Sequence, residues 1–149
     1  MRKEQLELVQ LKLQKSIFSL NHAFRQPPHG ELIAVNLSLH NRGEFIEDCT
    51  KARFLQIFQI QPSQFTPFFL EVEFAALFSL SFPVSPNEHD IYINHLFPQL
   101  IFPHTRDYVA EITKRGGFPP LQIDQGVFQE KAPQNSQNFP LFHGNKCFH

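Results

Sequence analysis

Alternating apolar and polar side chains in the first half of the chain predict four strands. The cleanest alternation is at about 33–40, and further strands are predicted at about 9–24 and 53–61. The fourth strand spans residues 68–82, where every second residue is apolar and the residues between include two Glu and two Ser. A strand with this pattern buries one face and leaves the other in water, as in an antiparallel sheet.

Two details of these strands follow from simple counting. Alternation along the first strand places Leu11 and Leu13 on the face opposite Phe18 and Leu20. The Asn-Arg-Gly sequence at 41–43 predicts a turn after the second strand, whereas residues 44–51 follow no clear pattern.

The period changes in the second half of the chain. Apolar residues recur at spacings of three and four between residues 103 and 115, with Phe97 and Ile101 continuing the stripe upstream, which predicts a helix with one apolar face. Gly116 and Gly117 provide the left-handed residue that ends such a helix. The Phe-Pro-Pro-Leu sequence at 118–121 can then neither continue a helix nor pair within a sheet.

Four strands followed by a helix predict an α+β fold, a four-stranded antiparallel sheet with the main helix packed on one face. A helix of about 13 residues spans only ~20 Å, which is less than the fourth strand. We therefore expect part of the apolar strand face to form a subunit interface, with Leu70, Val72 and Phe74 in it. A symmetric dimer, or a dimer of dimers, is the expected form.

Length and composition indicate a single intracellular domain. The chain has 149 residues, and we expect one domain at 1–130 and a flexible tail at 131–149, where polar residues and prolines prevail. A net charge of -1 gives no reason to expect binding to nucleic acid. The sequence has no signal-peptide pattern and no membrane-spanning run, and Cys49 and Cys147 lack a CxxC spacing. These features favour a cytoplasmic protein without membrane insertion and argue against a disulfide scaffold.

Histidines provide the only candidate chemistry. One group comprises His89, Asp90, His95, His104 and Asp107, and the tail holds a second, His143, Cys147 and His149. No metal-ligand spacing, nucleophile motif or phosphate-binding loop accompanies either group. We therefore expect no catalytic site, no metal and no cofactor.

The eighteen Phe residues indicate either an aromatic core or an apolar binding surface. A groove between the second strand, residues 44–51 and the 118–121 loop could hold an extended polypeptide through side-chain pockets and main-chain hydrogen bonds. The candidate lining residues are Phe45, Ile46, Phe97, Ile101, Phe118, Pro119 and Leu121. For each of them alone, a place in an ordinary core is at least as good an interpretation.

One run of the sequence resembles a known family. The matching residues are Ile101, Phe102, Pro103, Arg106, Arg115, Gly116, Phe118, Pro119 and Leu121. They resemble the SecB family of protein-export chaperones. The resemblance implies a homotetramer that holds unfolded preproteins in a translocation-competent state without ATP.

The resemblance also implies a partner, the SecA motor, which SecB proteins bind through acidic residues on the sheet face. Glu71 matches one such position and Phe69 a neighbouring apolar one. Asn21 and Arg25, however, stand where acids are expected, so the resemblance leaves SecA binding open.

Two alternatives to a general export role follow. Residues 71–78 and the double proline at 119–120 resemble SecB-like chaperones that accompany toxin–antitoxin systems and protect an antitoxin. Outside the family, the alternative is a structural or small-ligand-binding oligomer.

Overall fold

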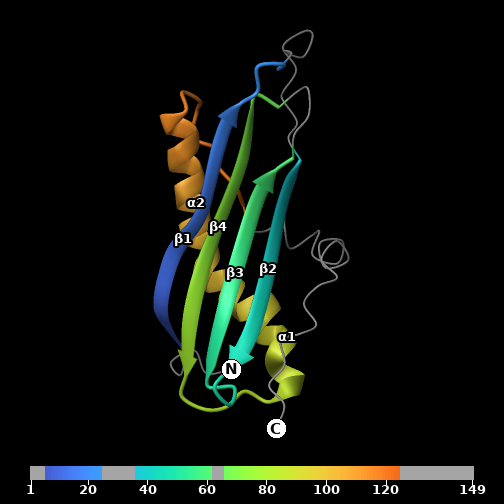
Figure 1. The fold of residues 1–149 in the computed structure, drawn as a ribbon, viewed down its shortest axis with the longest axis vertical. Coiled ribbons are helices and arrows are strands. Elements are labelled where there is room, and N and C mark those ends of the chain that lie inside the picture. Colours follow the sequence, from blue (N-terminus) through green and yellow to red (C-terminus); the bar gives the residue numbers. More distant parts are fainter. Residues whose placement is uncertain (1–5, 25–35, 62–65, 125–149) are drawn as a thin grey trace.

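The chain forms two layers, a sheet and a helical segment that crosses one of its faces (Figure 1). The computed structural model describes residues 6–24, 36–61 and 66–124. Within them the four strands are all antiparallel and lie in the order β1-β4-β3-β2. Their bounds are Leu6–Leu20 (β1), Leu37–Ile46 (β2), Lys51–Ile60 (β3) and Phe68–Leu80 (β4). The predicted α+β class is confirmed.

Strand β4 lies inside the sheet and shows the predicted alternation along its whole length. Every second residue from Phe68 to Leu80 is buried beneath the helical layer, and the residues between are half-exposed on the opposite, open face. β3 repeats the pattern, with Phe54 and Phe58 buried. The two strands together provide most of the floor of the core.

The second strand ends later than predicted, at Ile46. Residues 41–43 continue β2 and pair with β3, so the predicted turn there is wrong. The chain turns at Glu47–Cys49, where all three residues have positive φ, and Thr50 N–H donates to the Glu47 carbonyl over 3.1 Å. Gly43 has another reason to be glycine. A Cβ there would meet Ile93 Cγ1 at 2.6 Å, so the helical layer packs directly on the strand.

Two bulges in β1 change which side chains face the helix. The register with β4 shifts between Leu8 and Gln10 and again between Leu13 and Lys15. As a result Leu11 and Leu13 lie on the helix-covered face together with Phe18, and not opposite it as simple alternation predicted. Ile33 and Val35, assigned to the second strand from sequence, lie outside the described residues.

The helical layer is longer than predicted. It begins with a 3-10 turn at Pro86–Glu88 (η3) and continues through α1 (His89–Ile91), a π-helical turn at Tyr92–Leu96 (η4) and α2 (Phe97–Arg115). Pro103 lies inside α2 instead of starting it. About 30 helical residues reach ~45 Å, comparable to the ~43 Å of a 13-residue strand. The helical layer therefore covers β4 from end to end.

This cover revises the expected subunit interface. Leu70, Val72 and Phe74 are only 2%, 0% and 8% exposed, because they belong to the core beneath α2. The interface was expected on this face because the predicted helix of about 13 residues is too short to cover the fourth strand. Most of the large apolar side chains that are exposed in the described residues lie elsewhere, on β1.

Five residues of α2 face the core in a single stripe at intervals of four. Phe97, Ile101, Thr105, Val109 and Thr113 are all fully buried. The ring of Phe97 stacks on Phe78 of β4 with centroids 4.2 Å apart. The two threonines satisfy their hydroxyls inside the core, because Thr105 donates to Gln56 Oε1 over 2.7 Å and Thr113 to the Val109 carbonyl over 2.9 Å.

Cys49 is fully buried at the end of the β2–β3 turn, with its Sγ 3.7 Å from His89 Nε2. It is disulfide-bonded in the structure, which departs from the interpretation of the two cysteines as reduced. Cys147 and the predicted tail at 131–149 lie outside the described residues. None of the helices in the described part of the chain has the length and apolar character that a bilayer crossing requires.

Candidate functional site

The segment after α2 folds back on the body of the protein. Phe118 N–H donates to the Thr113 carbonyl over 3.1 Å, and Leu121 N–H donates to Thr113 Oγ1 over 2.9 Å. These bonds hold residues 118–121, which we name the FPPL segment, against the end of the helix. Phe118 and Leu121 are half-buried, whereas Pro119 and Pro120 are exposed.

An aromatic cluster packs the FPPL segment against β1 and β4. The ring of Phe118 lies 4.8 Å from that of Phe68 and 6.3 Å from that of Phe18, and Phe18 and Phe68 stack at 5.1 Å. We name these three rings the Phe18 cluster. Gly116 permits this packing, because a Cβ there would meet Phe18 Cζ at 2.3 Å. Phe68 is buried, whereas Phe18 and Phe118 are half-buried, and half-buried rings at the surface can accept an apolar side chain from a ligand without unfolding the core.

The residues predicted to line one groove lie in separate places. Phe45, Phe97 and Ile101 are core residues, exposed by 3%, 0% and 0%. Phe45 belongs to the opposite end of the sheet from Phe118, because Phe45 pairs with Ala52 beside Phe78, whereas Phe118 contacts Phe68. Ten residues of strand separate these ends by about 33 Å.

Strand alternation also separates the neighbours Phe45 and Ile46. Phe45 faces the helical layer, where its ring stacks on His89 with centroids 4.2 Å apart. Ile46 faces the open side of the sheet and pairs with Lys51. Of the predicted groove residues, only Phe118, Pro119 and Leu121 lie together at the surface.

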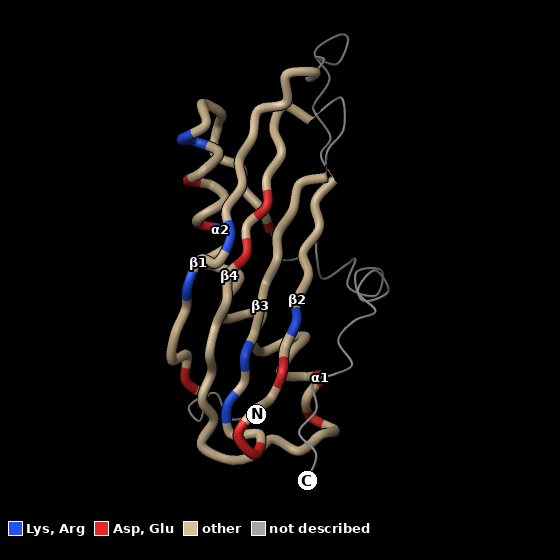
Figure 2. The backbone as a smooth tube through the Cα atoms, in the orientation of Figure 1, with Lys and Arg blue, Asp and Glu red and all other residues tan. Residues whose placement is uncertain are grey.

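The open face of the sheet carries the two predicted SecA-contact positions, Phe69 and Glu71. Lys15 of β1 lies between two carboxylates there, with its Nζ 2.8 Å from Glu71 Oε2 and 3.8 Å from Glu73 Oε2. In the backbone trace, a basic position of β1 runs beside acidic positions of β4 (Figure 2). The hydrogen bond from Lys15 lowers the pKa of Glu71, and the same bond raises the pKa of Lys15. The acidic positions on β4 are thus paired with a cation of the same chain.

The apolar surface missed by sequence reasoning lies along β1. Four of its large apolar side chains are exposed, Val9 by 51%, Leu13 by 41%, Ile17 by 44% and Leu20 by 47%. β1 is an edge strand, so its outer backbone groups also lack a neighbouring strand within the described residues. The signal was present in the sequence, since apolar residues occur in both phases of this strand.

The histidines were the candidate chemistry in the sequence, and the structure places His89 and His40 as follows. His89 is buried, and its Nε2 lies 3.3 Å from the Val84 carbonyl. Burial and the neighbouring Arg42 lower the pKa of His40 to about 3, so this imidazole is neutral at pH 7. In the portion of the chain that the structure describes, no three side chains of His, Cys, Asp or Glu come together in a way that could hold a metal ion.

Comparison with known proteins gives this geometry its context. The model of the family "SecB: Preprotein translocase subunit SecB" matches residues 25–137, which is more than half of the chain. The chain belongs to the SecB family. This agrees with the family indicated by the run from Ile101 to Leu121.

Curated SecB relatives match over part of their length. The chain is 45% identical over 79 residues to the protein-export protein SecB of Hyphomonas neptunium and 36% identical over 58 residues to that of Rhodospirillum centenum. These alignments cover 48% and 39% of this chain. They span 46% and 34% of the relatives, so the chain matches less than half the length of either.

Two solved structures share the fold. The Mycobacterium tuberculosis Rv1957 SecB-like chaperone, in complex with a ChAD peptide from the Rv1956 HigA1 antitoxin, aligns with a TM-score of 0.62 at 18% identity. That alignment covers 82% of this chain and 88% of the other. A protein of unknown function from Streptococcus agalactiae aligns with a TM-score of 0.51 at 8% identity, over 80% of this chain and 96% of the other.

Proposed function

We propose that this chain is a SecB-like holdase, a chaperone that binds unfolded polypeptides without ATP and keeps them competent for protein export. The observation that carries the proposal is the family match over residues 25–137. Two apolar surfaces on the described residues support it, the Phe18 cluster with the FPPL segment and the exposed side chains of β1. We place the protein in the cytoplasm, where unfolded preproteins are met before export. We assign it binding and no catalysis.

Affinity requires more than one contact site. A micromolar dissociation constant corresponds to about 8 kcal/mol, whereas burying one large apolar side chain contributes ~1.5 to 3 kcal/mol before ordering costs. The Phe18 cluster alone can bind one or two client side chains. A client therefore has to contact several such clusters at once, which an oligomer provides.

We assign the subunit contact to β1. Val9 and Ile17 lie on the open side or at a bulge, whereas Leu13 and Leu20 face the helical side, so both sides of the edge strand are apolar. Pairing of two copies through β1 would bury these side chains and satisfy the edge. We propose a homo-oligomer on this basis, with a dimer of dimers as its form.

The FPPL segment provides a direct test. Replacing Phe118 and Leu121 by Ser should reduce suppression of client aggregation severalfold, because the cluster loses two apolar contacts. Light scattering of a reduced, unfolded client with increasing amounts of the protein measures the effect. The control is the pair Ile91→Ser and Leu100→Ser, which removes two apolar side chains that are 40% and 41% exposed elsewhere. If the wild-type protein neither delays aggregation nor forms a complex, the holdase proposal fails.

A role dedicated to an antitoxin is the second candidate. The pairing of Lys15 with Glu71 and Glu73 favours it, because a neutralised acidic surface attracts the basic SecA tail less strongly. Isothermal titration with SecA, and separately with a peptide from an antitoxin, distinguishes the two roles. Binding of SecA alone supports general export, and binding of the antitoxin alone supports the dedicated role.

A further inference from the structure

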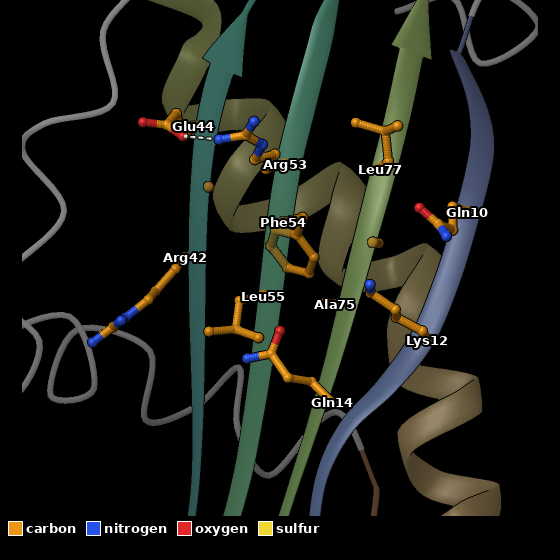
Figure 3. A pocket seen from close by; sticks show the side chains of 12 residues that line it. Gln10, Lys12, Gln14, Arg42, Glu44, Arg53, Phe54, Leu55, Ala75 and Leu77 are labelled. Carbon is orange, nitrogen blue, oxygen red and sulfur yellow. Dashed lines mark hydrogen bonds and ion pairs between the residues drawn. The ribbon is translucent and has the colours of Figure 1, made fainter.

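The open face of the sheet is hollowed where two cross-strand rows meet (Figure 3). The first row runs in register across all four strands as Lys12, Ala75, Leu55 and Arg42. The second row runs likewise as Gln10, Leu77, Arg53 and Glu44. Both rows line a hollow of about 480 Å³, which lies on the face that the helical layer does not cover.

The floor of this hollow is apolar. Ala75 and Leu77 of β4 and Leu55 of β3 form its centre, and each is half-buried without a covering layer in the described residues. The small side chain of Ala75 leaves room between the longer side chains of its row. A ligand that lies across the rows can therefore bury apolar atoms as well as contact polar ones.

The rim of the hollow is mainly cationic, with Lys12, Arg42 and Arg53 against the single carboxylate of Glu44. Arg53 Nη1 lies 3.4 Å from Glu44 Oε2, and both side chains are largely exposed, so this ion pair is weak. Lys12 extends over β4 and forms no ion pair within the described residues. Arg42 points over the outer edge of β2 and away from the hollow (Figure 3). The proposal below therefore uses only the cations of Lys12 and Arg53.

We propose that this hollow binds an acidic, extended segment of a partner polypeptide. Lys12 and Arg53 stand on β1 and β3, two strand spacings apart and also two residues apart along the strands, which is about 12 Å and too far for one phosphate or carboxylate to contact both. An extended chain advances about 3.3 Å per residue. Two carboxylates four residues apart, about 13 Å along the extended chain and on the same side of it, can therefore reach both cations, while an apolar side chain midway between them on that side rests on the floor.

The inference goes beyond the proposed holdase function, because its residues belong neither to the Phe18 cluster nor to the exposed apolar side chains of β1. It also distinguishes two halves of the open face. Near Glu71 and Glu73 the cation of Lys15 is already paired, whereas around the hollow the positive charges exceed the negative ones. Complementary charge then selects an acidic partner at this half.

Fluorescence anisotropy of the full chain with three probes that carry the same label tests the inference. The probes are an Asp-Leu peptide with the repeat Asp-Ser-Leu-Ser, a Lys-Leu peptide with Lys in place of each Asp, and a single-stranded oligonucleotide with the charge of the first peptide. We expect the Asp-Leu peptide to bind best and to weaken as salt rises, since exposed charges are screened. Preference for the basic peptide or for the oligonucleotide overturns the inference, as does binding of none.

Matched charge reversals locate the binding. The variant Lys12→Glu with Arg53→Glu should weaken binding of the Asp-Leu peptide about tenfold. The variant Lys114→Glu with Arg115→Glu changes the net charge equally at the exposed end of α2 and should leave binding unchanged. Equal weakening by both variants shows a general charge effect and contradicts the site. Aggregation suppression by the hollow variant stays at the wild-type level, so this result and a failure of the holdase proposal are distinguishable.

Discussion

Gln56 is a polar residue inside an apolar core, and its amide is satisfied at both ends. Its Nε2 donates to Asn41 Oδ1 over 2.9 Å, and its Oε1 accepts from the Thr105 hydroxyl over 2.7 Å. The chain of three side chains joins β2, β3 and α2. It fixes the helical layer on the sheet, because a buried polar atom without its partner is costly.

We expect Thr105→Val to lower the free energy of unfolding by about 1 to 3 kcal/mol, since it leaves Gln56 Oε1 buried without its donor. Urea unfolding at one fixed protein concentration, followed by circular dichroism, measures the change. Thr105→Ser keeps the hydroxyl and should cost less. A larger loss in Thr105→Ser than in Thr105→Val would show that packing of the methyl group matters more than the hydrogen bond.

Single residues also show why the site was harder to predict than the fold. Phe118 and Leu121 could be recognised, because prolines place them outside helix and sheet. Gly43 was misassigned to a turn, since the sequence cannot show that Ile93 would occupy the space of its Cβ. Contacts between residues far apart in the sequence decide which side chains meet, and they cannot be predicted from the local pattern of apolar and polar residues.

At the scale of elements, the helix start was missed because prolines at 98 and 103 favour a boundary. Tertiary packing prevails over that preference, since α2 buries a stripe at intervals of four from Phe97 to Thr113. Two of the five stripe residues are threonines, so a search for apolar residues at helical spacing detects only part of the stripe. Strands β3 and β4 were assigned almost correctly, because their alternation follows directly from burial on one side.

The ion pair between β1 and β4 makes a prediction about pH. Lys15 lowers the pKa of Glu71 below 4.5, so the pair stabilises the fold above that pH and the contribution is lost as pH falls through the lowered pKa. In Lys15→Met the pKa of Glu71 should rise toward its ordinary value, as measured by NMR titration of the carboxyl carbon. Lys12→Met on the same strand is the control and should leave the Glu71 titration in place. An unchanged pKa in Lys15→Met would contradict the assigned cause.

For the whole molecule, the two-layer architecture was predictable because it needs only the type and order of the elements. The location of the exposed apolar side chains was not predictable. The interface was expected on the face of β4 that α2 in fact covers, and most of the exposed large apolar side chains in the described residues lie on β1. Covering depends on the true length and path of the helix, and a sequence pattern gives neither.

Assembly through β1 has a measurable consequence. Replacing Leu13 and Ile17 by Lys should lower the solution mass to that of a smaller species, because two cations would have to be buried in each contact. Size-exclusion chromatography with light scattering gives the mass. The same two changes at Ile91 and Leu100 are the control and should preserve it. A wild-type monomer, or an unchanged mass in the β1 variant, excludes this contact.

The two bulges of β1 restrict which chains can join its edge. A straight, flat edge strand is an indiscriminate template for any extended peptide, and cells face aggregation when one is exposed. β1 bends where Val9 and Gln14 are inserted relative to β4, so a straight strand cannot follow it over its full length. A second copy of the same strand carries the same two bends at the same spacing. The two bulges that interrupt the alternation of β1 within one subunit thus make its edge selective for a second copy of the same strand.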